Sequence, residues 1–220
     1  MHKIINNLLD IQNTLKIKLD EFNYNNYSPK IVAVSKTYSI NHILPLINYG
    51  HLDFGENKVQ EALDKWTEIK KKNKNINLHL IGSLQTNKVK HALKIFDFIH
   101  SLDSQKLANK ISGEQIIQGK MPKIFIQVNI GNEDQKSGIK KEELKDFYNF
   151  CLSLKLNIIG TMCIPPNNKN SEKYFSEMSR INQELKFKDL SMGMSGDYLD
   201  AIKNKATYVR IGSKIFGNRD

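Results

Sequence analysis

The stretch "IVAVSKTYSINHILPLINYG", residues 31–50, contains one complete unit of the fold that we predict for the chain. Its first four residues are apolar and the fifth is a serine, which predicts a short buried strand over 31–35. A helix is predicted over 41–49, and Gly50 is a typical helix end. The unit is therefore strand, turn and helix, and the turn presents a lysine, Lys36, directly after the strand.

The same unit recurs along the whole chain. Further strands are predicted over 52–54, 78–81, 98–100, 123–129, 157–161, 189–192 and 207–211, and further helices over 58–72, 86–96, 104–119, 142–154, 171–186 and 198–204. Strict alternation predicts parallel strands joined by right-handed crossovers. Eight strands with helices between them fit a closed (β/α)₈ TIM barrel. An open doubly wound sheet is the alternative, but no G-x-G-x-x-G pattern follows any predicted strand.

The N-terminal stretch "MHKIINNLLDIQNTLKIKLDEF", residues 1–22, predicts an extra amphipathic helix rather than a signal peptide. Its apolar stripe is expected to pack on the outside of the barrel, and consists of Ile4, Leu8, Ile11, Leu15 and Leu19. No linker, repeat or low-complexity segment interrupts the chain, so we expect residues 1–220 to form a single barrel domain.

Composition indicates an ordinary globular protein of the cytoplasm. Apolar residues make up 40% and charged residues 25% of the chain, and no apolar run approaches the ~20 residues that cross a bilayer. We therefore expect a cytoplasmic protein with no membrane contact. Cys151 and Cys163 lie in apolar surroundings and are expected to be buried thiols rather than a disulfide.

The net charge of +10 raises the question of nucleic acid. The excess is nearly all lysine and is spread along the chain, whereas the arginines are only Arg180, Arg210 and Arg219. Nucleic-acid recognition prefers arginine, usually clustered, for its bidentate contacts. We therefore expect no nucleic-acid partner.

In a barrel of this kind the active site lies at the carboxyl ends of the strands. The residues expected there are rich in Gly, Ser and Asn and poor in acids. They are Ser35, Lys36 and Thr37 at the end of the first strand, Gly55, Glu56 and Asn57 at the end of the second, Gly82 and Ser83 at the third, Asn129 at the fifth, Met162 and Cys163 at the sixth, residues 193–197 at the seventh and residues 210–213 at the eighth. Glu56 and Asp197 are expected to cap a helix or pair with a lysine.

The last two of these strand ends suggest a phosphate site. The motifs "GMSG", residues 193–196, and "RIGSKIFG", residues 210–217, are rich in glycine and serine and lead toward helical segments. Loops after strands seven and eight of this barrel commonly bind phosphate, because glycine lets an anion reach the backbone N–H groups.

Lys36 lies at the first strand end, opposite that predicted phosphate site. A ligand that carries both a phosphate and an aldehyde would suit the pair, and pyridoxal 5′-phosphate is such a ligand, with lysine as its Schiff-base partner. Arg210 is ambiguous, since it could pair with a carboxylate or face the cofactor ring. A cation facing the pyridine nitrogen would keep that nitrogen unprotonated and weaken the ring as an electron sink.

Five stretches together closely resemble the pyridoxal phosphate homeostasis protein family. They are "IVAVSKTY", "GENKVQEAL", "HLIGSLQTNKVK", "IQVNIGNEDQKSGI" and "LSMGMSGDYLDAIKNKATYVRIGSKIFGNRD", and they run in order from residue 31 to the C-terminus. The family is similar to the N-terminal barrel of bacterial alanine racemases.

The resemblance implies roles for six residues. Lys36 would be the Schiff-base lysine, Arg210 would face the pyridine nitrogen, and Asn57 would line the cofactor. The phosphate would be held by Ser195, Gly212 and Ser213.

The resemblance further implies a protein of vitamin B6 homeostasis that holds pyridoxal phosphate without strong catalysis of its own. Transient contact with pyridoxal phosphate-dependent apo-enzymes would fit that role, and we expect a monomer. A racemase needs a second acid/base on the far face of the substrate. The chain ends just past the last predicted strand, and we expect no tyrosine or histidine to take that place. A pyridoxal phosphate-dependent racemase or another Schiff-base enzyme is the alternative.

A metal site is not expected. His42, His51, His79, His91 and His100 show no ligand spacing of a zinc site. His79 lies in the third predicted strand, and a satisfied core histidine is favoured over a group that approaches the pocket.

Overall fold

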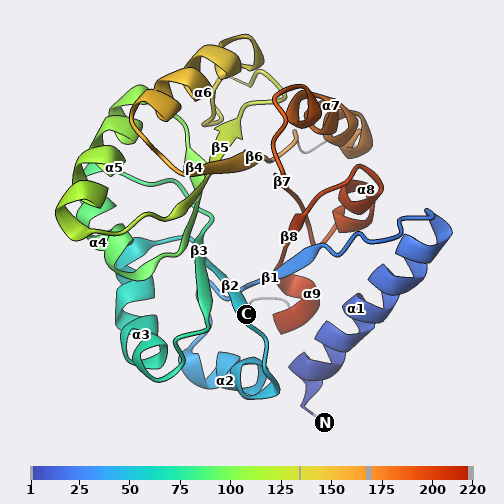
Figure 1. Ribbon diagram of the computed structural model, residues 1–220. Coiled ribbons are helices and arrows are strands. Elements are labelled where there is room, and N and C mark those ends of the chain that lie inside the picture. The colour runs from blue at the N-terminus through green and yellow to red at the C-terminus, as the bar shows by residue number, and fades with distance from the viewer. Residues whose placement is uncertain (1, 134, 167–169, 218–220) are drawn as a thin grey trace.

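The computed structural model, which describes residues 2–133, 135–166 and 170–217, contains a closed barrel of eight parallel strands in sequence order. Figure 1 shows the helices arranged around the barrel. The last strand pairs with the first, with Val32 opposite Arg210 and Ala33 opposite Ile211. The predicted (β/α)₈ barrel is therefore confirmed, and the open sheet is excluded by this closing pair.

The strand bounds agree with the predicted ones to within two residues at each end. The strands are β1 (Lys30–Val34), β2 (Asp53–Glu56), β3 (Asn77–Leu80), β4 (Phe98–Leu102), β5 (Lys123–Val128), β6 (Ile158–Cys163), β7 (Asp189–Met194) and β8 (Tyr208–Ile211). The sixth strand was predicted to end at Thr161, two residues too early, although Met162 and Cys163 do lie at its carboxyl end as expected. Both belong to β6, because they pair in register with Gln127 and Val128 of β5.

Helices alternate with these strands as predicted. They are α1 (Lys3–Glu21), α2 (Ile40–Tyr49), α3 (Val59–Lys72), α4 (Val89–Ile95), α5 (Gln105–Gln118), α6 (Leu144–Ser153), α7 (Ser171–Glu184), α8 (Tyr198–Lys203) and the short α9 (Ser213–Phe216), with 3₁₀ turns η1 (Thr86–Lys88) and η2 (Lys141–Glu143) before α4 and α6. The side chain of Ser104 caps α5, and Gly119 ends it in the left-handed conformation.

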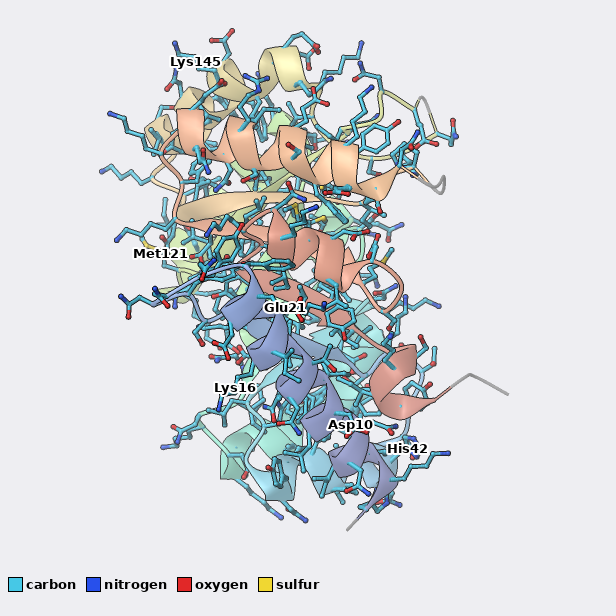
Figure 2. The ribbon with its side chains drawn as sticks, turned by 90° about the vertical axis from the view of Figure 1, so that its right-hand side faces the viewer. Asp10, Lys16, Glu21, His42, Met121 and Lys145 are labelled. Carbon is cyan, nitrogen blue, oxygen red and sulfur yellow. The ribbon has the colours of Figure 1, made fainter. Side chains whose placement is uncertain are left out.

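Helix α1 lies outside the ring of strand–helix units, as predicted. Ile4, Leu8, Ile11 and Leu15 are buried and Leu19 is half-buried, and the helix contacts α2, α8 and α9. In Figure 2 α1 lies across the front of the molecule, and the labelled Asp10, Lys16 and Glu21, all exposed, mark its polar side. Among the helices of the described residues, none has the length and apolar character that a membrane crossing requires.

The barrel wall separates two buried apolar clusters. The larger one lies mainly between the strands and the helices. The smaller one fills part of the barrel interior and consists of Val32, Phe98, Phe125, Met162 and Tyr208. The remaining interior space is occupied by polar side chains that lead toward the candidate site.

Candidate functional site

A cavity of about 590 Å³ opens at the carboxyl ends of the strands. All six residues that the sequence analysis assigned to the cofactor line it, together with seven others. The lining residues are Val34, Lys36, Tyr38, Asn57, Ile81, Ile164, Met194, Ser195, Gly196, Arg210, Gly212, Ser213 and Gly217.

Strand alternation brings Lys36 to the cavity. Side chains of a strand point alternately to its two faces, so Val32, Val34 and Lys36 share one face. Val32 belongs to the barrel interior and Val34 lines the cavity, which places Lys36 at the cavity wall. The next residue, Thr37, has φ 70°, and its backbone N–H donates to Glu61 Oε1 at 2.6 Å. β1 ends at Val34, and the left-handed residue Thr37 redirects the backbone directly after the lysine.

A buried polar cluster lies behind the backbone of Lys36. Glu56 is fully buried, and its Oε1 accepts hydrogen bonds from Ser35 Oγ at 2.7 Å, Lys65 Nζ at 3.0 Å and Trp66 Nε1 at 2.9 Å. Lys65 also donates to the Ser35 carbonyl at 2.9 Å. The predicted pairing of Glu56 with a lysine is confirmed. The cluster ties the end of β1 to β2 and α3 on the side away from the cavity.

Close backbone packing places Asn57. A Cβ atom added at Gly82 would lie 2.4 Å from the Asn57 carbonyl oxygen, so only glycine lets the loop after β3 pass this closely. Asn57 follows the buried Glu56 directly, and its side chain reaches the cavity on the opposite face of the strand.

The ends of β7 and β8 meet at Ser195. Its Oγ accepts from the backbone N–H groups of Gly212 at 3.2 Å and Lys214 at 3.4 Å. Gly193, with φ 88°, starts this turn, and a Cβ atom there would lie 2.5 Å from Ala201 Cβ.

Two other features shape this part of the cavity. A Cβ atom added at Gly196 would meet nothing within 4 Å, so the space in front of this glycine is open. Asp197 was expected to cap a helix or pair with a lysine. Its Oδ1 instead accepts from the Met194 N–H at 2.6 Å, and its side chain makes no cap hydrogen bond to α8. The carboxylate is used to close the 194–197 turn.

Arg210 forms the inner wall of the cavity and is 4% exposed. Its guanidinium donates to Ser191 Oγ at 2.6 Å and to the Cys163 carbonyl oxygen at 2.9 Å. Burial lowers the pKa of Arg210, while the nearby Cys163 and Asp197 act to raise it. Both acceptors are uncharged, a hydroxyl and a carbonyl. A purely structural ion pair would instead hold Arg210 against a carboxylate.

Sequence reasoning missed several residues of the lining, of which Tyr38 is the clearest. The Tyr38 hydroxyl donates to the Gly217 carbonyl at 2.9 Å, and the ring stacks against His42 and Phe216. Tyr38 belongs to the same short stretch as Lys36. However, it follows the left-handed turn at Thr37, after which strand alternation no longer indicates direction.

Other candidates from the sequence lie away from the cavity. Cys151 and Cys163 are buried as predicted, and burial raises the pKa of both thiols to about 12. His79 is a core histidine, with ring nitrogens 3.0 Å from Asp53 and from His100. In the part of the chain that the structure describes, no group of His, Cys, Asp and Glu could hold a metal ion.

Comparisons with known proteins agree with this geometry. Residues 17–220 match the family model "Alanine racemase, N-terminal domain". The chain is 38% identical to the pyridoxal phosphate homeostasis protein of Aquifex aeolicus, covering 86% of this chain and 87% of the relative. It is 35% identical to the protein of that name from Pasteurella multocida, covering 97% of both chains.

A solved structure is also similar. PipY of Synechococcus elongatus, with pyridoxal phosphate bound, is 30% identical, with a TM-score of 0.81 over 92% of this chain and 100% of that chain. Residue 134 and residues 218–220, which belong to two of the stretches that carry the resemblance, lie outside the described residues.

Proposed function

The chain belongs to the pyridoxal phosphate homeostasis protein family, and from this premise we propose that it holds pyridoxal 5′-phosphate as a Schiff base on Lys36. The protein then takes part in intracellular vitamin B6 homeostasis, storing the cofactor and releasing it to enzymes that need it. The observation that carries the proposal is the convergence of Lys36, Arg210 and the Ser195 loop on one cavity.

The phosphate fits at the junction of β7 and β8. The Gly212 N–H donates to Ser195 Oγ at 3.2 Å, so a backbone donor and a hydroxyl lie side by side at this wall of the cavity. Ser213 and Gly196 line the adjoining space, and the open volume in front of Gly196 leaves room for an anion. A phosphate there would accept from the Ser195 hydroxyl and would replace Ser195 Oγ as the acceptor of the Gly212 N–H, without displacing any side chain of the barrel core.

Arg210 supports a holding role over a catalytic one. When bound, pyridoxal phosphate supplies an aldehyde for covalent attachment and a ring that withdraws electrons. A buried guanidinium is always charged and has donors only, so it disfavours a proton on a ring nitrogen that it faces. The ring would then withdraw electrons poorly, which favours stable attachment of the cofactor over turnover.

The cavity lining also favours a protein without turnover. Among the described lining residues, the titratable side chains are Lys36, Tyr38 and Arg210. The sequence analysis expected no tyrosine that could be a second acid/base, yet Tyr38 does reach the lining. Its hydroxyl already donates to the Gly217 carbonyl, which leaves no proton directed into the cavity. A racemase or another Schiff-base enzyme that uses Tyr38 is the second candidate.

The binding test is borohydride reduction of the purified protein mixed with pyridoxal phosphate, followed by peptide mass mapping. We expect one modified lysine, Lys36, and no modification or visible absorbance in Lys36→Ala. Lys30→Ala is a matched control, because Lys30 begins the same strand at its other end and is exposed. Equal labelling of Lys36→Ala and the wild type would refute the assignment.

The turnover test separates the two candidates. A carrier should transfer its cofactor to an apo-enzyme, with no racemisation of alanine or other amino acids above the level of free pyridoxal phosphate. Racemisation by the wild type that is abolished in Tyr38→Phe would instead show that the protein is a racemase that uses Tyr38.

A further inference from the structure

A line of hydrogen-bonded side chains crosses the barrel interior from the cavity wall toward the opposite end. Arg210 Nη1 lies 2.6 Å from Ser191 Oγ, and Ser191 Oγ lies 2.9 Å from His100 Nδ1. His100 Nε2 lies 3.0 Å from His79 Nδ1, and His79 Nε2 lies 3.0 Å from Asp53 Oδ1. We call these five residues, from β8, β7, β4, β3 and β2, the Arg210–Asp53 chain.

Aromatic rings shield the middle of this chain from water. Phe98 stacks on His79 with ring centroids 4.1 Å apart, and Phe125 packs on His100 at 4.3 Å. Tyr208 lies about 6 Å from both imidazoles. His79, His100 and Ser191 are fully buried. Each of their polar atoms therefore depends on its neighbour in the chain for a hydrogen bond.

The chemistry of the two ends gives the chain one direction. Arginine has only donors, and an ionised carboxylate has only acceptors. Asp53 therefore accepts from His79 Nε2–H, and a neutral His79 must accept at Nδ1 from His100 Nε2–H. His100 then accepts at Nδ1 from the Ser191 hydroxyl, which leaves the Ser191 oxygen to accept from Arg210. Every hydrogen bond points from Arg210 toward Asp53.

The opposite order fails for neutral rings. If His100 donated from Nδ1, His79 would have to donate from Nδ1 as well. A lone pair on His79 Nε2 would then face the Asp53 carboxylate, two acceptors 3.0 Å apart.

The surroundings favour neutral rings. Burial lowers the pKa of His79 more than the hydrogen bond and charge of Asp53 raise it. For His100, burial lowers the pKa well below its usual value, and the positive charge of Arg210 acts in the same direction.

We propose that Ser191 and His100 are positioning residues for Arg210, and that the directed chain holds the guanidinium in one orientation at the cavity wall. The Ser191 hydrogen is committed to His100, so the lone pairs of its oxygen face the guanidinium. The negative charge of Asp53 at one end and the positive charge of Arg210 at the other both favour hydrogen bonds that point from Arg210 toward Asp53. The link to the cofactor rests on the proposed function, because it takes the group that Arg210 faces to be pyridoxal phosphate.

The direction of the chain is tested without cofactor. Ring-nitrogen NMR of ¹⁵N-labelled wild-type protein at pH 7.5, assigned through His79→Gln and His100→Gln, reports the proton on each ring. We expect both histidines to be neutral with the proton on Nε2. A proton on Nδ1 of His100, or a doubly protonated ring, would overturn the proposal.

The effect on the site is tested by pH titration of visible absorbance in the loaded protein. Ser191→Ala should move the midpoint in the same direction as Arg210→Gln, by about half to one pH unit. Ser191→Thr keeps the hydroxyl and should restore the wild-type midpoint. Met162→Leu, an apolar change in the same barrel interior, should not move it.

A loaded Ser191→Ala protein with an unshifted midpoint would refute the positioning role. Failure of the wild type to bind pyridoxal phosphate would instead refute the proposed function, and the tautomer measurement would still decide the direction of the chain.

Discussion

The two faces of the barrel wall bury different kinds of side chain, and β1 alone illustrates the difference. Ile31 and Ala33 point outward and join the large apolar cluster beneath the helices. Val32 points inward and joins a cluster with four other residues, beside a chain of polar groups that ends at Arg210. The outer face needs apolar volume of the right shape, whereas the inner face also needs specific partners for specific atoms.

This difference separates stability from function in the molecule. A cavity made on the outer face weakens the packing of a helix but leaves the polar partners of the inner face in place. A change on the inner face leaves a buried donor or acceptor without its partner. The effect then extends along the Arg210–Asp53 chain to Arg210 at the cavity wall. The four predictions below test this separation, from the largest expected effect to the smallest.

Phe175→Ala on α7 tests the outer face. Phe175 is fully buried, and its truncation should lower the free energy of unfolding by about 4 kcal/mol, because it removes apolar contacts and leaves a cavity. Denaturant unfolding measures the loss, and cofactor loading of the folded variant should equal that of the wild type. The control Ile117→Ala removes a side chain that is 77% exposed and should change stability by less than ~0.5 kcal/mol. A small loss for Phe175→Ala would contradict the assigned role of the outer cluster.

Glu56→Gln tests the buried polar cluster on the outer side of the barrel wall. Glu56 is fully buried and accepts three hydrogen bonds, one of them from Lys65, whose side chain is only 9% exposed. Removing the charge should cost about 3 kcal/mol, because it breaks a buried ion pair and leaves Glu61 as the remaining carboxylate on the Lys65 ammonium group. The control Glu68→Gln breaks a pair with Lys71 on the surface of α3, the helix that also carries Lys65, and should cost less than ~0.5 kcal/mol. Equal losses in both variants would show that burial of Glu56 has no energetic consequence.

Lowering the pH should reduce the free energy of unfolding through His79 and His100 on the inner face. Burial keeps the pKa of both rings below their usual value of 6.5 in the folded protein, so the unfolded chain binds more protons below about pH 6.5. This part of the stability is complete above pH 6.5 and is lost as pH falls toward the folded-state pKa values. Each histidine contributes up to about 1.4 kcal/mol per pH unit in that window.

The measurement is denaturant unfolding between pH 5 and 8. His100→Gln should reduce the slope of stability against pH, whereas the exposed control His91→Gln should leave it unchanged. A slope of the opposite sign would mean that the interior rings are protonated in the folded state.

Thr37→Gly tests the rim of the cavity and should have the smallest effect. Thr37 has φ 70°, a conformation that costs a branched residue about 1–2 kcal/mol and glycine nothing, although glycine loses more entropy on folding. A net gain of about 0.5 kcal/mol in the free energy of unfolding is expected. Lys155→Gly, also at positive φ but remote from the cavity, should give a similar gain. A loss above ~1 kcal/mol in Thr37→Gly alone would show that the threonine side chain has a role at the site.

The fold was largely predictable from the sequence because its signals are local. A strand followed by a helix and a glycine can be recognised within some twenty residues, and eight repeats of that unit leave few ways to arrange parallel strands. Helix α1 was predictable for the same reason, since its stripe from Ile4 to Leu15 has a period that only a helix satisfies. The errors fell at element ends, as with Met162 and Cys163, where pairing with the neighbouring strand decides how far β6 continues.

The candidate site was predictable where position along a strand was enough. Lys36, Asn57 and the serines and glycines of the β7 and β8 ends lie a few residues past predicted strands, and the barrel brings all carboxyl ends of its strands together. Tyr38 was not predictable in this way, because the turn at Thr37 breaks the alternation on which the argument depends.

The sequence by itself determined the order of strands and helices, the barrel that follows from it and the residues at the strand ends, because each depends on neighbours within one unit. Only the tertiary structure decided which polar atoms meet inside the barrel. His100 and Ser191 are 91 residues apart, yet their side-chain atoms lie 2.9 Å from each other. Their partnership arises from the closure of the barrel, which turns side chains of distant strands toward one axis and excludes the water that would otherwise satisfy them.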